Sequence, residues 1–346
     1  MSNALPAEMR AVVLPEEHRD LTDALRSLRV GLRPVPQPGP GQVVVRIEAA
    51  PCNPSDLALI QSRYGVKKTF PAVPGTEGAG IVVAGGGGAF ARWLVGKRVA
   101  CGGQGHRDGT WAEYCLAEAR ACIPLRRDLT FDQGATLIVN PLTALILFDA
   151  ARRGRHRAAV QTAGASQLGR MLVRLAVRAA YPLISVVRSA SQVERLRSLG
   201  APVVLDSTSN DFEARLRGEC QRLDATIAFD AVAGPMSRIL MSAMPRNSTI
   251  QIYGGLSGQE ISGMDPRAFI FENKRLEGFW LSRWVGKAGF LQLVRLTNRA
   301  QALVADGTLG TEVHRRVRLE EVPEALVNYQ KRMTEGKVLI VPSGVV

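Results

Sequence analysis

The chain has 346 residues and a net charge of +13, and it is longer than one typical hydrophobic core requires, so two domains are expected. Hydrophobic residues make up 46% and charged residues 22%, which excludes a disordered chain. No uninterrupted apolar run reaches the roughly 18 residues of a membrane-spanning helix. The excess charge is mostly arginine, with no interleaved aromatic residues and no nucleic-acid-binding motif, so nucleic acid is disfavoured as a partner.

Two further features concern the compartment. The N-terminal sequence MSNALPAEMR has no basic start followed by an apolar block, which favours a cytoplasmic protein. The five cysteines form no C-x-x-C pair and their number is odd, so they are expected to be buried free thiols.

Residues 1–134 have the texture of a small β-rich domain. They are rich in Gly and Pro and carry short β-like runs at 42–50, 79–85, 97–102 and 111–117. Such short runs separated by turn residues predict a compact, mostly antiparallel, barrel-like domain.

From residue 135 the pattern alternates between strands and helices. Strand-like runs lie at 158–163, 183–188, 202–206, 225–230 and 249–254, and helical stretches lie at 167–180, 190–199, 210–222 and 234–244. Strands that are apolar throughout and separated by helices predict an α/β domain, with a doubly wound parallel sheet covered on both faces. A sixth β-like run at 275–282 closes this second domain at 135–283, and residues 284–346 are expected to rejoin the first.

The first strand–turn–helix of this sheet carries an incomplete glycine motif. Gly164 and Gly169 occupy the outer positions of G-x-G-x-x-G, and Ser166 replaces the middle glycine. The helix start at Gln167 and Leu168 offers free N–H groups and the positive end of the helix dipole to a pyrophosphate. An ordinary βα turn is the alternative interpretation, because a degenerate glycine motif alone is weakly specific.

Arg188 decides the expected cofactor. It ends the second strand, nineteen residues after Gly169, where a site for NAD has an Asp or Glu that holds the ribose 2′-hydroxyl. An arginine there suits a 2′-phosphate, so the pair predicts NADPH. The alternative is a solvated surface arginine, of which this chain has many.

Several phrases then carry a family resemblance. They are 53-NPSDLALIQSRY-64, 71-PAVPGTEGAGIV-82, 109-GTWAEY-114, 139-VNPLTA-144, 229-FDAVAG-234 and 278-GFWLSRW-284. In this order and over nearly the whole chain, they resemble the zinc-independent medium-chain dehydrogenase/reductases, especially quinone oxidoreductases and mitochondrial-type 2-enoyl thioester reductases. The resemblance implies a GroES-like catalytic domain, a Rossmann domain inserted in it, and a homodimer joined through the Rossmann sheet edges near 275–282.

The same resemblance predicts that no metal is bound. Zinc-dependent members need a Cys where this chain has Asn53 and a His where it has Thr76. An amide and a threonine hydroxyl are not the ligands that zinc selects in proteins. Ser166 and Gln167 depart from the glycines usual in quinone reductases, and a serine there tilts the resemblance toward the thioester reductases.

Without a metal, hydrogen bonds must polarise the substrate carbonyl. Tyr64 is the candidate donor or proton source, since its phenol, with a reference pKa of ~10, stays protonated at neutral pH. A tyrosine that only packs under the cofactor is the alternative. Asn53 is expected to line the same cleft. Further cofactor contacts are expected at Asn140, Thr143, Gly254 and Gly255.

The sequence therefore predicts an NADPH-dependent oxidoreductase that reduces an activated C=C, as in an enone or a 2-enoyl thioester, or a quinone. A quinone reductase proper shares the fold, cofactor and site. An NADPH-binding protein without turnover, structural or RNA-associated, is the alternative of another class, kept open by the positive charge. The residues do not select the substrate or its chain length.

Overall fold

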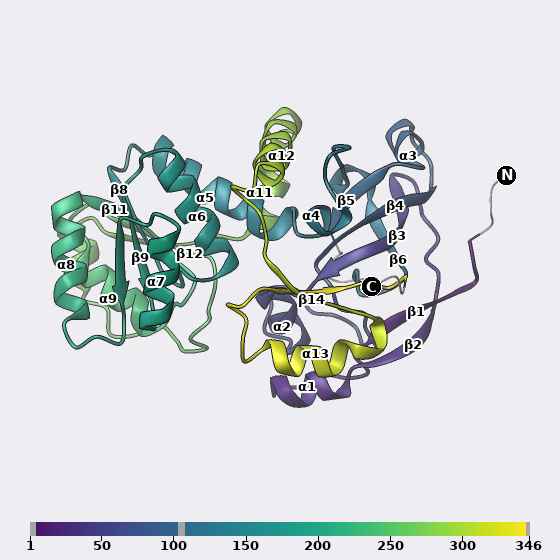
Figure 1. The fold of residues 1–346 in the computed structure, drawn as a ribbon, viewed down its shortest axis with the longest axis horizontal. Helices are drawn as coiled ribbons and strands as arrows, with labels where there is room; N and C mark the ends of the chain where they lie inside the picture. The colour runs from purple at the N-terminus through teal and green to yellow at the C-terminus, as the bar shows by residue number, and fades with distance from the viewer. Residues whose placement is uncertain (1–4, 103–107, 344–346) are drawn as a thin grey trace. The chain divides into compact units, whose positions relative to one another are not determined.

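The computed structural model describes residues 5–102 and 108–343 (Figure 1). The chain forms two compact units. The first consists of residues 1–139 and 310–346, and the second of residues 140–309. Each is described below by itself.

The first unit is built on a mostly antiparallel sheet. Its strand order is β14-β15-β3-β4-β5-β7, with β6 beside β3, and β1 and β2 form a separate pair. All pairings are antiparallel except β14 with β15. The strands are β1 (Glu8–Val13), β2 (Arg29–Pro34), β3 (Gln42–Pro51), β4 (Glu77–Gly85), β5 (Arg98–Gly102), β6 (Tyr114–Glu118), β7 (Ile123–Pro124), β14 (Val313–Val317) and β15 (Lys337–Ile340).

Short helices join these strands. They are α1 (Leu21–Ser27), α2 (Pro54–Ile60), α3 (Ala89–Leu94), α4 (Phe131–Ala135) and α13 (Val322–Tyr329), with 3-10 turns at Ala119–Ala121 and Leu319–Glu321. The core of the unit is aliphatic around Trp111, which is fully buried. Its indole N–H donates to the Pro51 carbonyl at 3.1 Å, so the ring satisfies its one polar group while filling the core.

The second unit contains the expected parallel sheet. Its order is β10-β9-β8-β11-β12-β13, and every pairing is parallel. The strands are β8 (Ala158–Gln161), β9 (Leu183–Val187), β10 (Val203–Asp206), β11 (Ala225–Asp230), β12 (Thr249–Ile252) and β13 (Arg275–Gly278). Strand β9 is buried along its whole length, as strands covered on both faces are.

Helices cover this sheet on both sides. Figure 1 shows α8 (Phe212–Leu223) and α9 (Pro235–Ala243) on one side, and α5 (Thr143–Arg153) and α6 (Gln167–Arg178) on the other. The remaining helices are α7 (Ala190–Ser198), α10 (Pro266–Ile270), α11 (Leu281–Lys287) and α12 (Phe290–Ala305). A π-helical turn at Ile138–Leu142 spans the boundary between the units and contains Pro141.

The second boundary differs from the expected one. The sequence texture suggested a return to the first domain at residue 284, whereas the second unit extends to Leu309. Helix α12 explains the difference, because Arg299 pairs with Asp149 of α5 at 2.8 Å. Just beyond α12, Asp306 pairs with Arg178 of α6 at 2.7 Å. The sheet strand β13 is also only four residues long, since the chain turns into α11 at Leu281.

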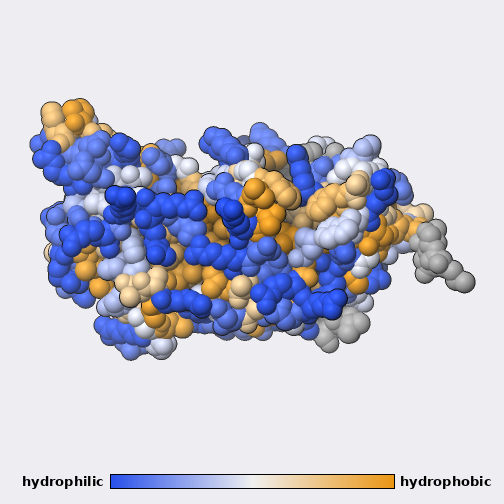
Figure 2. Space-filling model, turned by 90° about the horizontal axis from the view of Figure 1, so that it is seen from above, coloured by the Kyte–Doolittle hydropathy of each residue, from blue (hydrophilic) through white to orange (hydrophobic). Residues whose placement is uncertain are grey.

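Other features agree with the sequence. All five cysteines are buried and free, as expected. Within residues 5–102 and 108–343, no helix combines the length and apolarity needed to cross a membrane. Figure 2 shows hydrophilic side chains over much of the face seen from above.

Candidate functional site

The turn between β8 and α6 depends on Gly169. A Cβ atom at this position would lie 2.4 Å from the Gly164 carbonyl oxygen and 2.7 Å from that of Ala163. No real side chain fits there, so Gly169 lets the first turn of α6 approach the strand end closely. Ala163 itself has a φ of 49°, in the left-handed region, which makes the turn sharp.

Ser166 has a structural reason to replace the middle glycine. It is the N-cap of α6, and its hydroxyl accepts a hydrogen bond from the Gly169 N–H at 3.0 Å. A serine side chain at this position satisfies one of the helix amides that lack an intrahelical acceptor. Gln167 and Leu168 are the first two helical residues, so their N–H groups have no intrahelical acceptor. The turn therefore fits a phosphate group despite its altered motif.

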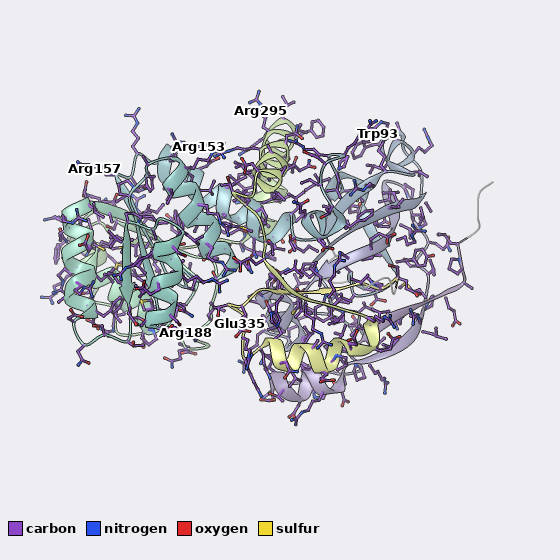
Figure 3. All side chains as sticks on the ribbon, viewed as in Figure 1. Trp93, Arg153, Arg157, Arg188, Arg295 and Glu335 are labelled. Atoms are coloured by element: carbon purple, nitrogen blue, oxygen red, sulfur yellow. The ribbon has the colours of Figure 1, made fainter. Side chains whose placement is uncertain are left out.

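Arg188 lies at the same edge of the sheet. It follows the last residue of β9, and the Gly164 N–H donates to the Val186 carbonyl of that strand at 2.9 Å. The side chain is exposed (Figure 3), and its guanidinium forms no ion pair with any residue that the structure describes. The arginine is thus available to an anionic group near the glycine turn.

A buried carboxylate organises the neighbouring strand end, and the sequence reasoning missed it. Asp230 is fully buried at the end of β11, where it accepts from the Thr162 hydroxyl at 2.7 Å and from the Ser237 hydroxyl at 2.6 Å. The N–H groups of Val232 and Ala233 also donate to it. Asp230 thereby ties the loop after β11 to the turn after β8. The only signal in the sequence was the phrase 229-FDAVAG-234.

The two glycines after β12 differ in environment. A Cβ on Gly254 would lie 2.8 Å from the Ala231 carbonyl oxygen, so this glycine permits close packing against the loop after β11. Gly255 is exposed and a Cβ there would meet nothing within 4 Å. Close approach of a ligand to the backbone at Gly255 remains a prediction.

In the first unit, Asn53 belongs to a buried polar cluster. Its backbone N–H donates to the Asp56 carboxylate at 2.7 Å, which caps α2, and its side-chain N–H donates to Glu77 at 2.9 Å. Its side-chain oxygen accepts from the Lys337 ammonium. Asn53 is fully buried with both ends of its amide bonded. The sequence analysis expected Asn53 to line an open cleft. The structure corrects this expectation, because Asn53 lies in the interior and supports the polar cluster from there.

The two carboxylates of this cluster have altered acidity. Burial raises the pKa of Glu77 to about 7, although hydrogen bonds from Val139 and Asn53 oppose the change. Burial likewise raises the pKa of Asp56 to about 6, against the hydrogen bond from the Asn53 backbone. Burial lowers the pKa of Lys337, while the nearby Glu77 and Asp56 oppose this. The cluster thus holds two acids that titrate closer to neutrality than usual.

The residues at the zinc register do not form a ligand set. Asn53 is occupied by its hydrogen bonds, and Thr76 carries only a hydroxyl. In the part of the chain that the structure describes, no group of three or more His, Cys, Asp or Glu side chains is placed to hold a metal ion.

The remaining predicted residues are distributed between the units. Tyr64 is half-buried in the loop that follows α2 in the first unit. Asn140 lies in the π-helical turn, and Thr143 is the buried first residue of α5 in the second unit.

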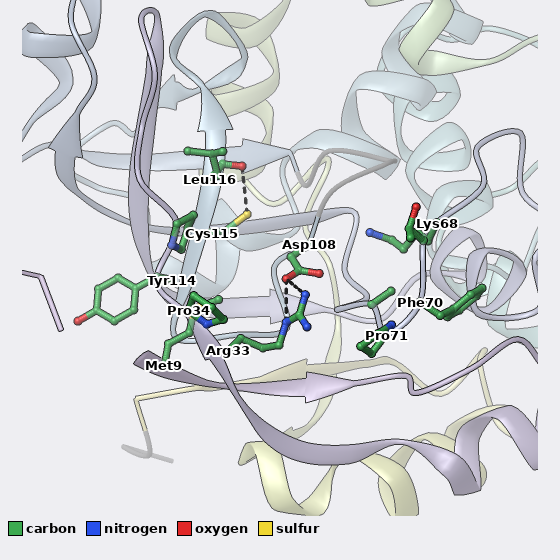
Figure 4. Close-up of a pocket in the computed structure, with 13 residues that line it drawn as sticks. Met9, Arg33, Pro34, Lys68, Phe70, Pro71, Asp108, Tyr114, Cys115 and Leu116 are labelled. Atoms are coloured by element: carbon green, nitrogen blue, oxygen red, sulfur yellow. Dashed lines mark hydrogen bonds and ion pairs between the residues drawn. The ribbon is translucent and has the colours of Figure 1, made fainter. Parts of the chain in front are cut away.

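A pocket in the first unit is lined by none of the predicted site residues. It has a volume of about 460 Å³ and is lined by residues that include Arg33, Lys68, Asp108 and Tyr114 (Figure 4). Arg33 pairs with Asp108 at 3.0 Å, and burial lowers the pKa of Lys68. The carboxylate and one cation of this pocket therefore already neutralise each other.

Comparison with known proteins agrees with this geometry. The family model of the alcohol dehydrogenase GroES-like domain matches residues 39–127, and that of the zinc-binding dehydrogenases matches residues 168–299. A Mesorhizobium loti protein provisionally named NADPH:quinone reductase is 37% identical, with a TM-score of 0.92 over 98% of this chain and 100% of that one.

Curated relatives extend the comparison to enoyl reductases. The mitochondrial enoyl-[acyl-carrier-protein] reductase of Rattus norvegicus is 30% identical over 81% of this chain and 74% of its own length. The Homo sapiens protein of the same name is 28% identical over 98% of this chain and 90% of its own length. The chain belongs to the medium-chain dehydrogenase/reductase family, in its quinone and enoyl reductase branch.

Proposed function

We propose that the protein is a reductase that uses NADPH to reduce an activated C=C bond, as in an enone or a 2-enoyl thioester, or a quinone. The observation that carries the proposal is the glycine turn at the start of α6, with exposed Arg188 at the end of the neighbouring strand. The names of the similar proteins, an NADPH:quinone reductase and enoyl reductases, support it.

The cofactor site is assigned to the carboxyl edge of the parallel sheet. Gly164, Ser166, Gln167, Leu168 and Gly169 would receive the pyrophosphate, because the α6 N-terminus presents N–H groups and a positive dipole end there. Arg188 would pair with the 2′-phosphate, which distinguishes NADPH from NADH. Asn140, Thr143, Gly254 and Gly255 would contact the nicotinamide half of the cofactor.

The chemistry of the chain's own residues centres on Tyr64. When bound, the reduced nicotinamide supplies a hydride. The substrate oxygen then gains negative charge, and the Tyr64 hydroxyl would donate a hydrogen bond to it or supply a proton. A phenol can do this at neutral pH without a metal. We therefore expect a chelator to leave turnover unchanged, and one tightly held zinc per purified chain would contradict this mechanism.

Turnover assays separate the candidate functions. Purified protein is supplied with NADPH and with a crotonyl thioester, a simple enone or a quinone, and NADPH oxidation is followed. We expect turnover of a thioester or enone, with NADH a poorer donor. Turnover of the quinone alone would identify a quinone reductase proper. NADPH binding without turnover of any of these, together with retention on RNA at physiological salt, would favour the non-catalytic alternative.

We also propose a homodimer through the edge of the parallel sheet. Strand β13 is the last strand of its sheet and is largely exposed. Ile270 and Phe271, which precede it, are 68% and 65% exposed. An exposed edge strand flanked by apolar side chains fits pairing with a second copy. Light scattering should give a dimer for the native chain and a monomer for the double variant Ile270→Asp, Phe271→Asp; a native monomer would refute the proposal.

A further inference from the structure

A chain of buried hydrogen bonds starts at Lys337, the first residue of β15. Its ammonium donates to the Cys52 carbonyl at 2.8 Å and to the Asn53 side-chain oxygen. Lys337 is only 2% exposed, so its charge is held away from water. A buried ammonium is retained only where charged or polar groups bind it well.

The chain continues through Asn53 to Glu77 and on to the backbone. The Asn53 side-chain N–H donates to one Glu77 oxygen at 2.9 Å. The other Glu77 oxygen accepts the backbone N–H groups of Ile138 at 3.0 Å and Val139 at 2.8 Å. Three donors thus face one carboxylate that is 1% exposed.

The two backbone groups have a particular place in the chain. Val139 is the last residue of the first unit, and Asn140 is the first residue of the second. Glu77 therefore holds the backbone directly before the segment of Asn140 and Thr143. At its other end, Asn53 caps α2, after which the chain runs to Tyr64.

We propose that Glu77 is a positioning residue: its carboxylate, held by Lys337 through Asn53, fixes the backbone at Ile138 and Val139 and thereby orients the segment of Asn140 and Thr143 toward the cofactor. This inference rests on the proposed NADPH-dependent reduction. Glu77 contacts no reacting atom and acts through the backbone that it holds.

If the same groups had a purely structural role, their main contribution would be to the stability of the fold. A buried ionic cluster is a weak source of stability, because well-packed apolar side chains of similar volume often serve as well. Two carboxyl groups and one ammonium with directed hydrogen bonds are better suited to holding a backbone in one orientation. The orientation of reacting groups affects the reaction rate, since misplacing such a group by about 1 Å can lower the rate roughly 10²-fold.

Glu77→Gln is the most direct variant. An amide of the same shape offers one oxygen to the three donors and places its own N–H₂ group among them. Whichever way this amide is turned, a donor then faces a donor. With its oxygen toward Asn53, the Ile138 and Val139 N–H groups lose their acceptor; with its oxygen toward those two groups, they bond an uncharged amide and the link through Asn53 to Lys337 breaks. Lys337→Met removes the cation that holds Asn53 and should have the same effect in weaker form. Should Glu77→Gln fail to fold, Lys337→Met tests the proposal alone.

The matched control is Lys274→Met in the second unit. Lys274 is also buried, its ammonium donates to the Met241 carbonyl at 2.8 Å, and it pairs with Glu272 at 2.7 Å. This variant removes an equally buried ammonium that takes no part in the network of Lys337, Asn53 and Glu77.

The first measurement is amide hydrogen exchange of the cofactor-free protein, read on peptides that cover residues 138–143. We expect exchange at Ile138 and Val139 to be at least about 10-fold faster in Glu77→Gln, since these N–H groups either lose their acceptor or bond an uncharged oxygen that is no longer held through Asn53. Lys274→Met should leave it unchanged. Native protection in both network variants would overturn the proposal, whether or not the protein turns over any tested substrate.

The second measurement is steady-state kinetics of the folded variants. We expect Glu77→Gln to lower kcat by roughly 10- to 100-fold while KM for NADPH changes less than about 3-fold, because the phosphate contacts lie elsewhere. A variant with native kcat, or one whose loss lies wholly in KM, would show that Glu77 does not position the reacting groups. If no substrate turns over in the native protein either, the proposed function fails and the exchange result decides the positioning role.

Discussion

Arg188 is the residue on which we propose that cofactor choice depends. Its guanidinium is exposed beside the glycine turn and forms no ion pair within the described residues. Arg188→Ala should weaken NADPH binding by roughly 1.5–3 kcal/mol, as expected for a charged hydrogen bond, and NADH binding much less. Fluorescence titration of both cofactors measures the difference.

The control for Arg188 is an exposed arginine of the same unit. Arg217 lies on α8 and donates to the Ser242 hydroxyl at 3.0 Å. Arg217→Ala removes the same charge and should leave both cofactor affinities nearly unchanged. Equal losses for NADPH and NADH in Arg188→Ala would remove Arg188 as the discriminating residue.

Tyr64 is the residue that separates chemistry from packing. If its hydroxyl stabilises charge on the substrate oxygen in the transition state, Tyr64→Phe should lower kcat by about 10²–10³ and leave KM nearly unchanged. The phenylalanine ring keeps the packing, so a tyrosine that only supports the cofactor would predict native kcat. An enone or enoyl thioester is the better test substrate, because a quinone is already strongly electron-accepting. Tyr114→Phe, on β6, serves as the matched control.

At the scale of elements, the turn before α6 offers a sharp test of packing. Gly169→Ala would place a Cβ 2.4 Å from the Gly164 carbonyl oxygen, so α6 must move away from the turn. We expect a loss of about 1–3 kcal/mol in the free energy of unfolding, together with weaker NADPH binding. Urea denaturation and cofactor titration measure these two effects.

The control is a glycine at which an added Cβ would meet open space. Gly218 lies inside α8, and a Cβ there would meet nothing within 4 Å. Gly218→Ala should raise the free energy of unfolding by roughly 0.5–1 kcal/mol, since alanine loses less conformational freedom in a helix. If Gly169→Ala is as well tolerated as Gly218→Ala, the close contact does not constrain the turn.

The elements that could be predicted were those with a strong hydrophobic period. The five strands β8 to β12 of the parallel sheet and the helices between them lie where the apolar runs and amphipathic stretches predicted them. Helices such as α1 and α3, of 7 and 6 residues, carry too few turns to show a period. The extent of α12 depended on ion pairs with α5 and α6, which no local pattern reveals.

The candidate site was predictable to a similar degree. The positions of Gly164, Gly169 and Arg188 at a turn and a strand end could be predicted because these features have fixed spacing along the chain. Their contact with a cofactor stays a prediction. The link between Glu77 and Lys337 could not be predicted, because the two residues lie 260 positions apart in the sequence. Their common partner is the Asn53 amide, which carries no charge that would suggest a pair. Residues that meet only through the fold leave no mark on sequence spacing.

At the scale of the whole molecule, the charge state of Glu77 that holds the backbone best differs from the charge state that favours stability. Ionised Glu77 accepts three hydrogen bonds, yet burial penalises this form and raises its pKa to about 7. Protonation of Glu77 should therefore stabilise the fold while weakening its hold on Ile138 and Val139. The form that orients the backbone best is not the most stable form.

This opposition has a measurable sign. Glu77 has a folded-state pKa of about 7 against an ordinary 4.5, so the folded protein binds this proton more tightly than the unfolded chain does. The stabilisation is fully present below pH 4.5 and is lost as the pH rises through about 7. Asp56 acts in the same direction between its ordinary 3.8 and about 6.

Glu77→Gln isolates one of these two contributions, because an amide does not titrate in this range. We expect the free energy of unfolding of Glu77→Gln, measured relative to the native protein, to rise by up to about 3 kcal/mol between pH 5 and pH 8. Urea denaturation of both proteins at several pH values measures this difference, and the contributions of distant surface groups cancel in it. Lys274→Met should show no comparable trend between the same pH values. A constant difference between Glu77→Gln and the native protein would mean that Glu77 keeps an ordinary pKa in the fold, and that its ionised form costs the molecule nothing.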